Sequence, residues 1–301
     1  MLVACDKQPS ATTQPEPEPV IDSLSFVVIG DWGMGGNTTQ RKIAEQIFAK
    51  SRLHNARFVV TAGDNFYPSG VADVSDQNWQ KSFEEIYVED SLPLKWYPVL
   101  GNHDYQGNPQ AEVEYSDVST RWTMPARYYT QRMQIDDDHS VFLAFTDTSP
   151  FLTEYYGSAR IGPKLVGQDT SVQLRWLDSS LNKSNDTWKI VVGHHPVYSS
   201  GLHGNTPQLT GSFDSILNER GVNFYIAGHD HHIEHLKPTT SSLHYFISGG
   251  GADEYPVQPT PASLFARSSP GFLIVTLYEE KCEFYFYNDN GELVHSYSHG
   301  S

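Results

Sequence analysis

Basic residues, cysteines and long apolar runs are all scarce in this chain of 301 residues. Lys and Arg together number 20 against 36 Asp and Glu, the formal net charge is −16, and no block of Lys or Arg occurs. This balance argues against nucleic acid or an anionic membrane as an electrostatic partner. No run of about 20 apolar residues occurs, so no segment is predicted to span a membrane. Phosphate-bearing substrates are still compatible with this composition if a bound metal ion dominates the local charge of the site.

The length and composition favour one large domain with a substantial core, since 38% of the residues are hydrophobic and 19% are charged. Two cysteines, Cys5 and Cys282, could form one disulfide. Cys5 has a second interpretation, because Met-Leu-Val-Ala-Cys at positions 1–5 matches the short pattern that precedes the lipid-modified cysteine of bacterial lipoproteins. Residues 7–20 are rich in Ser, Thr, Gln, Pro and Glu, a composition typical of an extended tether.

A bacterial signal peptide needs a basic region and about 7–15 apolar residues before the cysteine, and this sequence shows neither. Two explanations stay open. Either the natural chain starts further upstream and Cys5 carries a lipid anchor, which we favour, or the match is accidental. On the first explanation the protein is a lipoprotein with a signal peptide, held on the periplasmic side of the bacterial cell envelope. On the second we expect secretion.

The segment 224–231, Phe-Tyr-Ile-Ala-Gly-His-Asp-His, organises the rest of the chain. In extended backbone, residues i and i+2 share a face and lie roughly 6–7 Å apart, so His229 and His231 can point into one cleft. That spacing suits one metal ion or two adjacent ions. A single His-x-His is equally consistent with a polar turn after a buried strand, so the interpretation depends on whether the pattern recurs.

Four other apolar runs also stop at glycine and then present polar side chains. They end before Asp31, before Asp64 with Asn65 and Tyr67, before Asn102 with His103 and Asp104, and before His194 with His195. Open α/β sheets place their sites outside the carboxyl ends of parallel strands. Five such runs favour a shared site over five unrelated turns.

The remaining patterns predict two sheets packed face to face, with helices outside. The predicted helices cover 39–50, 171–181 and 213–218, with a further amphipathic helix marked by Trp79, Phe83, Ile86 and Tyr87. The predicted strands cover 24–30, 58–63, 97–101, 140–146, 188–192 and 223–227, followed by an antiparallel tail at 243–248, 271–278, 282–287 and 293–298. We expect 105–132 to be a long loop over one lip of the cleft and 151–170 to be an irregular, mobile flap.

Seven candidate ligands are too many for one ion: Asp31, Asp64, Tyr67, Asn102, His194, His229 and His231. Two metal ions about 3.5–4 Å apart, bridged by one carboxylate, use such a set and suit phosphoester chemistry. We expect Asp64 to be the bridge, because it stands between the motifs of Asp31 and Asn102. A position with two carboxylates, a phenolate and one His favours a trivalent ion, and one with neutral Asn and two His favours a divalent ion.

With these motifs the chain resembles the small, tartrate-resistant type of purple acid phosphatase in the calcineurin-like metallophosphoesterase superfamily. The resemblance runs from Leu24 to the C-terminus. Its motifs stand in the family's order: Gly30-Asp31-Trp32-Gly33, Gly63-Asp64-Asn65-Phe66-Tyr67, Gly101-Asn102-His103-Asp104, Gly193-His194-His195-Pro196 and Gly228-His229-Asp230-His231. It implies a four-layer αββα sandwich of the α/β class, with two packed mixed sheets flanked by helices.

The resemblance also implies a site. Asp31, Asp64, Tyr67 and His231 would hold Fe(III), and Asp64, Asn102, His194 and His229 would hold a divalent Fe, Zn or Mn. The implied activity is that of an acid phosphatase, in which a metal-activated hydroxide attacks a phosphate monoester. His103 and His203 would position the phosphate and protonate the leaving group. We expect Asp104 to orient an imidazole, and His195, His232, His235 and His244 to lie around the same region.

Two alternatives stay open: a phosphodiesterase or nucleotidase on the same scaffold, and a non-catalytic, anchored phosphate-binding protein. The complete ligand set argues against the second. The expected organisation is a lipobox remnant and tether at 1–23 and one catalytic domain at 24–301, in a monomer that acts on small phosphomonoesters.

Overall fold

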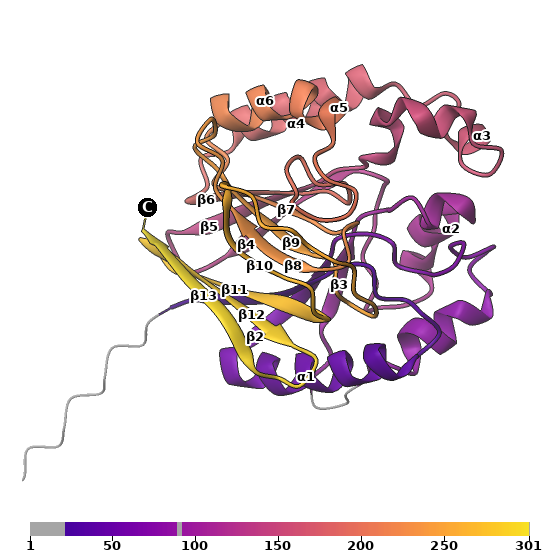
Figure 1. The fold of residues 1–301 in the computed structure, drawn as a ribbon, viewed down its shortest axis with the longest axis horizontal. Helices are drawn as coiled ribbons and strands as arrows, with labels where there is room; N and C mark the ends of the chain where they lie inside the picture. Colours follow the sequence, from indigo (N-terminus) through magenta and orange to yellow (C-terminus); the bar gives the residue numbers. More distant parts are fainter. Residues whose placement is uncertain (1–21, 89–91, 301) are drawn as a thin grey trace, which may run out of the picture.

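The computed structural model describes residues 22–88 and 92–300, in which two mixed β-sheets pack against each other between layers of helix (Figure 1). The predicted tether and Cys5 lie outside these residues. Within them, no helix has the length and apolar character that crossing a membrane requires. The predicted sandwich of two packed mixed sheets is confirmed.

The first sheet has the strand order β13-β12-β11-β1-β2-β3. The pairs β1–β2 and β2–β3, at one end of the sheet, are parallel, whereas β1–β11, β11–β12 and β12–β13 are antiparallel. The strands are β1 (Leu24–Ile29), β2 (Ala56–Thr61), β3 (Lys95–Pro98), β11 (Gly271–Leu277), β12 (Lys281–Asn288) and β13 (Leu293–Gly300).

The second sheet has the order β10-β8-β9-β7-β6-β5-β4, and its four strands β9, β7, β6 and β5 run parallel. The strands are β4 (Tyr129–Gln134), β5 (Ser140–Phe145), β6 (Trp188–Val192), β7 (Phe224–Ala227), β8 (Ile233–Leu236), β9 (His244–Ser248) and β10 (Ser263–Arg267). The predicted tail is therefore divided between the sheets: β9 pairs parallel with β7, and β11, β12 and β13 return to β1.

Helices cover the outer face of each sheet, as Figure 1 shows with α1 beyond the first sheet and α4, α5 and α6 beyond the second. Asn37 caps α1 by accepting a hydrogen bond from the backbone N–H of Gln40 at 2.7 Å, and the helix ends at Asn55 in left-handed conformation. The long helices are α1 (Thr38–His54) and α4 (Thr170–Lys183), and the shorter ones are α2 (Pro109–Glu114), α3 (Gly162–Leu165), α5 (Pro207–Ser212) and α6 (Asp214–Glu219).

Two connecting segments differ from the expected loops. The segment 105–132 contains α2, the 3₁₀ turns η2 (Asp104–Gln106) and η3 (Tyr115–Asp117), and the start of β4. The segment 151–170 contains η5 (Thr153–Gly157) and α3, and it follows η4 (Ser149–Phe151). The expected amphipathic helix near Trp79 is a single π-helical turn, η1 (Trp79–Glu84), although the four marker side chains are buried as predicted.

An aromatic cluster beside the first sheet supports the loops after β1 and β2. Trp32 is fully buried, and its ring centroid lies 5.2 Å from that of Trp96 and 5.6 Å from that of Phe66. Its indole N–H donates to Asn65 Oδ1 at 3.2 Å. Because Trp32 follows Asp31 and Asn65 follows Asp64, this packing fixes the two loops relative to each other.

Candidate active site

The five predicted loops lie at the carboxyl ends of parallel strands from both sheets. Asp31, Asp64 and Asn102 follow β1, β2 and β3, which are neighbours in the first sheet. His194 and His229 follow β6 and β7, which are neighbours in the second. The candidate residues therefore come from the strand ends of both sheets, and within each sheet they come from neighbouring strands.

Three of these residues adopt left-handed backbone conformations, which residues other than glycine rarely adopt. The φ angles are 58° at Asp31, 48° at Asp64 and 70° at His229. Such geometry costs of order 1–3 kcal/mol per residue and persists where the surroundings fix it, often at functional sites. The preceding glycines allow the close approach: a Cβ at Gly101 would lie 2.2 Å from Asp64 Oδ1, and one at Gly228 would lie 2.5 Å from Asp31 Oδ2.

A first group of donors surrounds the hydroxyl of Tyr67. This oxygen lies 3.0 Å from Asp31 Oδ1, 3.0 Å from Asp64 Oδ2 and 2.9 Å from His231 Nε2. Asp31 and His231 are also close, with Oδ1 and Nε2 3.5 Å apart. The ring of Tyr255 stacks on that of His231 with centroids 4.0 Å apart. Four side chains thus direct oxygen or nitrogen atoms at one point.

A second group surrounds Nε2 of His194. Asn102 Oδ1 lies 3.1 Å away, His229 Nδ1 lies 3.2 Å away, and Asp64 Oδ2 lies 3.5 Å away. Asp64 Oδ2 is therefore near both groups. Its other oxygen accepts the backbone N–H of His103 at 2.7 Å. Asp64 thus lies near both groups, and its role as a bridging ligand stays a prediction.

The protonation of these groups suits a cation. His194 Nδ1 lies 2.8 Å from the carbonyl oxygen of Ala62, which can only accept, so Nδ1 carries a proton and the neutral ring has its lone pair at Nε2. Against the effect of burial, the carboxylates of Asp64 and Asp31 raise the pKa of His194, so a cation at Nε2 would displace a second proton. Burial, helped by the imidazoles of His195 and His194, lowers the pKa of His229 well below its ordinary value, which keeps that ring neutral. Neutral imidazole is the form that ligates metals.

The donor set fits metal ions better than it fits a site without them. Asp31 is fully buried and Asp64 nearly so, and Tyr67, imidazoles and backbone N–H groups surround their carboxylates. Buried carboxylates are costly without a compensating charge. Burial and the charges of Asp31 and Asp64 also raise the pKa of Tyr67 well above its ordinary value, so a phenolate there needs a cation beside it.

His195 lies against the second group, but both of its ring nitrogens have other partners. Nδ1 lies 2.8 Å from Thr148 Oγ1, and Nε2 lies 3.0 Å from the hydroxyl of Tyr155. The ligand atoms of Asp31, Asp64 and His194 all lie within 4.8 Å of one another, and those of His194, His195 and His229 form a second such set. Because its nitrogens are engaged, His195 supports the site without belonging to the donor set.

His103 and His203 approach the two groups from different loops. His103 Nδ1 lies 2.7 Å from the carbonyl oxygen of Pro68, so this nitrogen donates and Nε2 remains available. The ring of His203 packs on that of His229 with centroids 4.3 Å apart. The buried carboxylate of Asp230 accepts the backbone N–H of His203 at 2.8 Å and thereby anchors the loop.

Two predictions about neighbouring residues are wrong. Asp104 does not orient an imidazole, because its carboxylate accepts the backbone N–H groups of Gly101, Asn65 and Phe66 at 2.8–3.1 Å. Burial and the Asp64 carboxylate raise the pKa of Asp104 to about 7. His235 and His244 lie in a separate cluster with His295 of β13. His232 pairs with Glu234, with Nε2 and Oε2 3.0 Å apart.

A cleft of about 390 Å³ opens beside the second group. The donor-set residues Asn102 and His229 line it together with His203. Leu152, Glu154 and Tyr155, from 151–170, form part of its wall. That segment, rather than 105–132, therefore lines this cleft. No motif marks Glu154, Tyr155 or Tyr255 as site residues, because they stand in irregular segments of the sequence.

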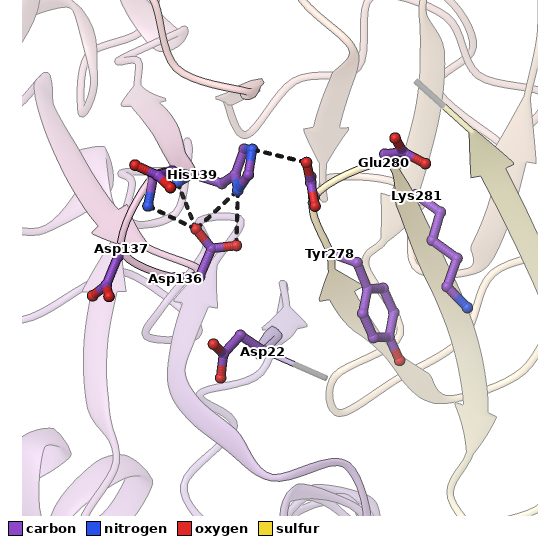
Figure 2. A pocket seen from close by; sticks show the side chains of 9 residues that line it. Asp22, Asp136, Asp137, His139, Tyr278, Glu280 and Lys281 are labelled. Carbon is purple, nitrogen blue, oxygen red and sulfur yellow. Dashed lines mark hydrogen bonds and ion pairs between the residues drawn. The ribbon is translucent and has the colours of Figure 1, made fainter. Parts of the chain in front are cut away.

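A larger hollow lies elsewhere on the described part of the chain (Figure 2). It measures about 770 Å³ and is lined by Asp22, the turn 136–139 and residues 278–281. His139 Nδ1 pairs with Asp136 at 2.8 Å, and its Nε2 lies 3.3 Å from Glu279. No residue of the five strand-end motifs lines this hollow, so it is not the candidate active site.

Comparisons with known proteins identify related sequences. A family model described as calcineurin-like phosphoesterase matches residues 24–232. Purple acid phosphatase 17 of Arabidopsis thaliana is 36% identical over 296 residues, which cover 94% of this chain and 86% of that protein. Tartrate-resistant acid phosphatase type 5 of Oryctolagus cuniculus is 34% identical over 247 residues, covering 79% of this chain and 75% of that protein.

A solved structure shares the fold across nearly the whole chain. GAP50, the anchor in the inner membrane complex of Plasmodium, superimposes with a TM-score of 0.80 at 24% identity. The match covers 92% of this chain and 89% of that one. At this identity the likeness establishes the architecture of the two sheets.

Proposed function

This chain belongs to the calcineurin-like phosphoesterase family, its relatives support an acid phosphatase, and we propose that it hydrolyses small phosphate monoesters at a dinuclear metal centre built from the two donor groups. One observation carries the proposal. Asp64 Oδ2 lies within 3.0 Å of Tyr67 Oη and within 3.5 Å of His194 Nε2, where a bridging carboxylate would have to lie.

The two groups differ in charge, which suggests different ions. The first group would hold Fe(III) through Asp31, Asp64, Tyr67 and His231, because hard anionic oxygens favour a trivalent ion. The second would hold a divalent Fe, Zn or Mn ion through Asp64, Asn102, His194 and His229, whose only charge is the shared carboxylate. Such a pair, when bound, lowers the pKa of water and neutralises charge that develops on the phosphoryl oxygens.

The protein's own side chains complete the reaction. His103 would donate from Nε2 to a phosphoryl oxygen as an imidazolium, because the neutral ring carries its one proton on Nδ1, which donates to the Pro68 carbonyl. Its backbone N–H is held by the Asp64 carboxylate. His203 lines the adjoining cleft and would give a proton to the departing alcohol. Its packing on His229 keeps the imidazole beside the donor groups without making it a ligand.

Side-by-side kinetics of a monoester and a diester of the same phenol test this function. We expect multiple turnovers of the monoester at acidic pH with a larger kcat/KM than the diester, because a monoester presents more unsubstituted phosphoryl oxygens to the metals and to His103. Preference for the diester would identify the phosphodiesterase alternative. Absence of turnover in metal-loaded protein would favour a phosphate-binding protein.

We also propose that residues 24–301 form one monomeric catalytic domain, and that 1–23 tether it to the bacterial cell envelope through a lipid on Cys5. The support is the composition of 7–20 and the lipobox match, both of which lie outside the described residues. Mass spectrometry of the mature protein from its native host tests the anchor. An unmodified N-terminus that retains Met1 would contradict it.

A further inference from the structure

The cleft beside the second donor group has two walls from segments far apart in the sequence. One wall is formed by Leu152, Glu154 and Tyr155, and the other by the segment 205–208, which leads into α5. A hydrogen bond joins the walls, in which Gln208 Nε2 donates to Glu154 Oε2 at 3.0 Å. Tyr155 is fixed at its other end by the contact between its hydroxyl and His195 Nε2.

The charge of this cleft is one-sided. Among the described residues that line the cleft, and apart from its histidines, only Glu154 has a formally charged side chain. The opposite wall offers neutral groups: Asn205, Thr206, Pro207 and Gln208. A lining of this kind presents a carboxylate and hydrogen-bonding groups to whatever occupies the cleft, with no Lys or Arg among the described lining residues to attract an anion.

The position of the cleft assigns its occupant. Its floor carries Asn102 and His229, so a phosphoryl group bound at the proposed metal centre lies at one end. His203, the proposed proton donor to the leaving oxygen, lines the same space. The ester oxygen must therefore point into the cleft, and the alcohol part of the substrate must lie in the space that Glu154 and the segment 205–208 line.

We propose that Glu154 determines specificity by favouring phosphate monoesters whose alcohol is cationic or uncharged, such as amino-alcohol phosphates, and by disfavouring alcohols that carry further anionic groups. The inference rests on the proposed phosphatase function, because it concerns the leaving-group side of that same centre. A carboxylate in this place attracts an ammonium group and repels a second carboxylate or phosphate. The Gln208 hydrogen bond holds the charge over the cleft.

Three phosphate monoesters of similar size test the proposal: phosphoethanolamine, propyl phosphate and 3-phosphoglycerate. The quantity measured is kcat/KM for each ester at one pH with the metal-loaded enzyme. Glu154→Gln keeps the shape and the acceptor oxygen for Gln208, and it should lower the ratio of phosphoethanolamine to 3-phosphoglycerate by about two- to fivefold, the size of one exposed charge contact. Glu154→Lys should lower it further. Glu45→Gln, on the exposed face of α1, should leave the ratio unchanged.

Two further readouts separate a charge effect from a structural one. Propyl phosphate should be hydrolysed equally well by wild type and Glu154→Gln, and the wild-type ratio should shrink as salt is raised, because exposed charges are screened. An unchanged ratio in both Glu154 variants, with normal turnover of propyl phosphate, would overturn the inference and leave the phosphatase function intact. If metal-loaded wild type hydrolysed none of the three esters, the function and the inference would both fail.

Discussion

Tyr67 is a side chain whose protonation depends on a bound cation. Burial and the carboxylates of Asp31 and Asp64 hold its pKa far above the ordinary value, so only a strongly charged ion favours the phenolate. A phenolate on Fe(III) absorbs visible light by charge transfer. We therefore expect the oxidised, iron-loaded protein to be pink to purple and Tyr67→Phe to lose that band in the visible spectrum.

Iron content measured in parallel makes the colour decisive. Tyr67→Phe that keeps its iron but is colourless would identify the phenolate as the chromophore. A colourless wild type with a full complement of Fe(III), or an unchanged band in the variant, would remove Tyr67 from the ligand set.

Removing His103 and removing His203 should change the rates of ester hydrolysis in different ways. General-acid help matters most for a poor leaving group and is typically worth about 10²–10⁴-fold. His203→Ala should therefore slow an alkyl phosphate far more than a nitrophenyl phosphate, whose anion leaves without a proton. His103→Ala should slow both esters alike, because its available Nε2 would contact the phosphoryl group common to them.

The comparison uses kcat/KM for both esters in both variants. Leaving-group sensitivity confined to His103→Ala would exchange the two roles. Equal losses for both esters in both variants would exclude either imidazole as the specific proton donor.

At the scale of elements, strands β8, β9 and β13 bring a histidine cluster together away from the active site. His235 Nε2 lies 2.8 Å from His244 Nδ1, and His235 Nδ1 lies 3.2 Å from His295 Nε2. Tyr297, His299 and Lys237 also face this cluster. Burial, with the neighbouring His244, His295 and Lys237, lowers the pKa of His235 to about 2; burial, with Lys237 and His299, lowers that of His244 to about 4.

This cluster predicts a loss of stability in acid. Below the ordinary histidine pKa of 6.5, the unfolded chain takes up protons that the folded cluster excludes. The free energy of unfolding therefore falls as the pH drops from about 6.5 towards the lowered values, by up to about 1.4 kcal/mol per pH unit for each such histidine. His235→Phe should make that fall shallower. Denaturant unfolding of both proteins at pH 7 and pH 5, with the same metals bound, measures the difference.

The aromatic neighbours make His235→Phe a suitable probe, because the ring of His235 already stacks on Phe246 with centroids 4.4 Å apart. An equal fall in the free energy of unfolding of wild type and variant between pH 7 and pH 5 would contradict this prediction. In that case the cluster does not exclude protons in the folded state, and the acid sensitivity must arise elsewhere.

The sequence predicts an element well when the spacing of its apolar residues matches the faces that are buried in the fold. The runs that became β1, β2, β6 and β7 are almost continuously apolar, because both of their faces are covered. β8 escaped prediction because its residues Ile-Glu-His-Leu mix charge with apolar side chains. Glu234 is nevertheless fully buried, since Ser200 and His232 satisfy its carboxylate. Tertiary partners decide such a strand, and a local pattern does not contain them.

For the whole molecule, local sequence patterns reveal part of the site, and the rest depends on contacts that form only in the folded chain. The seven candidate ligands could be named because each lies within four residues after a glycine at a strand end, and such ends meet at one edge in space. The walls of the cleft could not, because Glu154 and Gln208 meet only after 151–170 and α5 have packed against the second sheet. The partners of Asp104 and His103 likewise depend on how the loops cross.

The central claim is that both sheets supply one centre for two metal ions with Asp64 shared, and metal content per chain tests it most directly. We expect wild type purified from iron- and zinc-supplemented culture to hold two ions per chain, at least one of them iron. Asn102→Ala should mainly lose the divalent ion, whereas Asp64→Ala should lose occupancy at both positions. A catalytically active wild type with a single ion, or equal loss of one ion in both variants, would contradict the account.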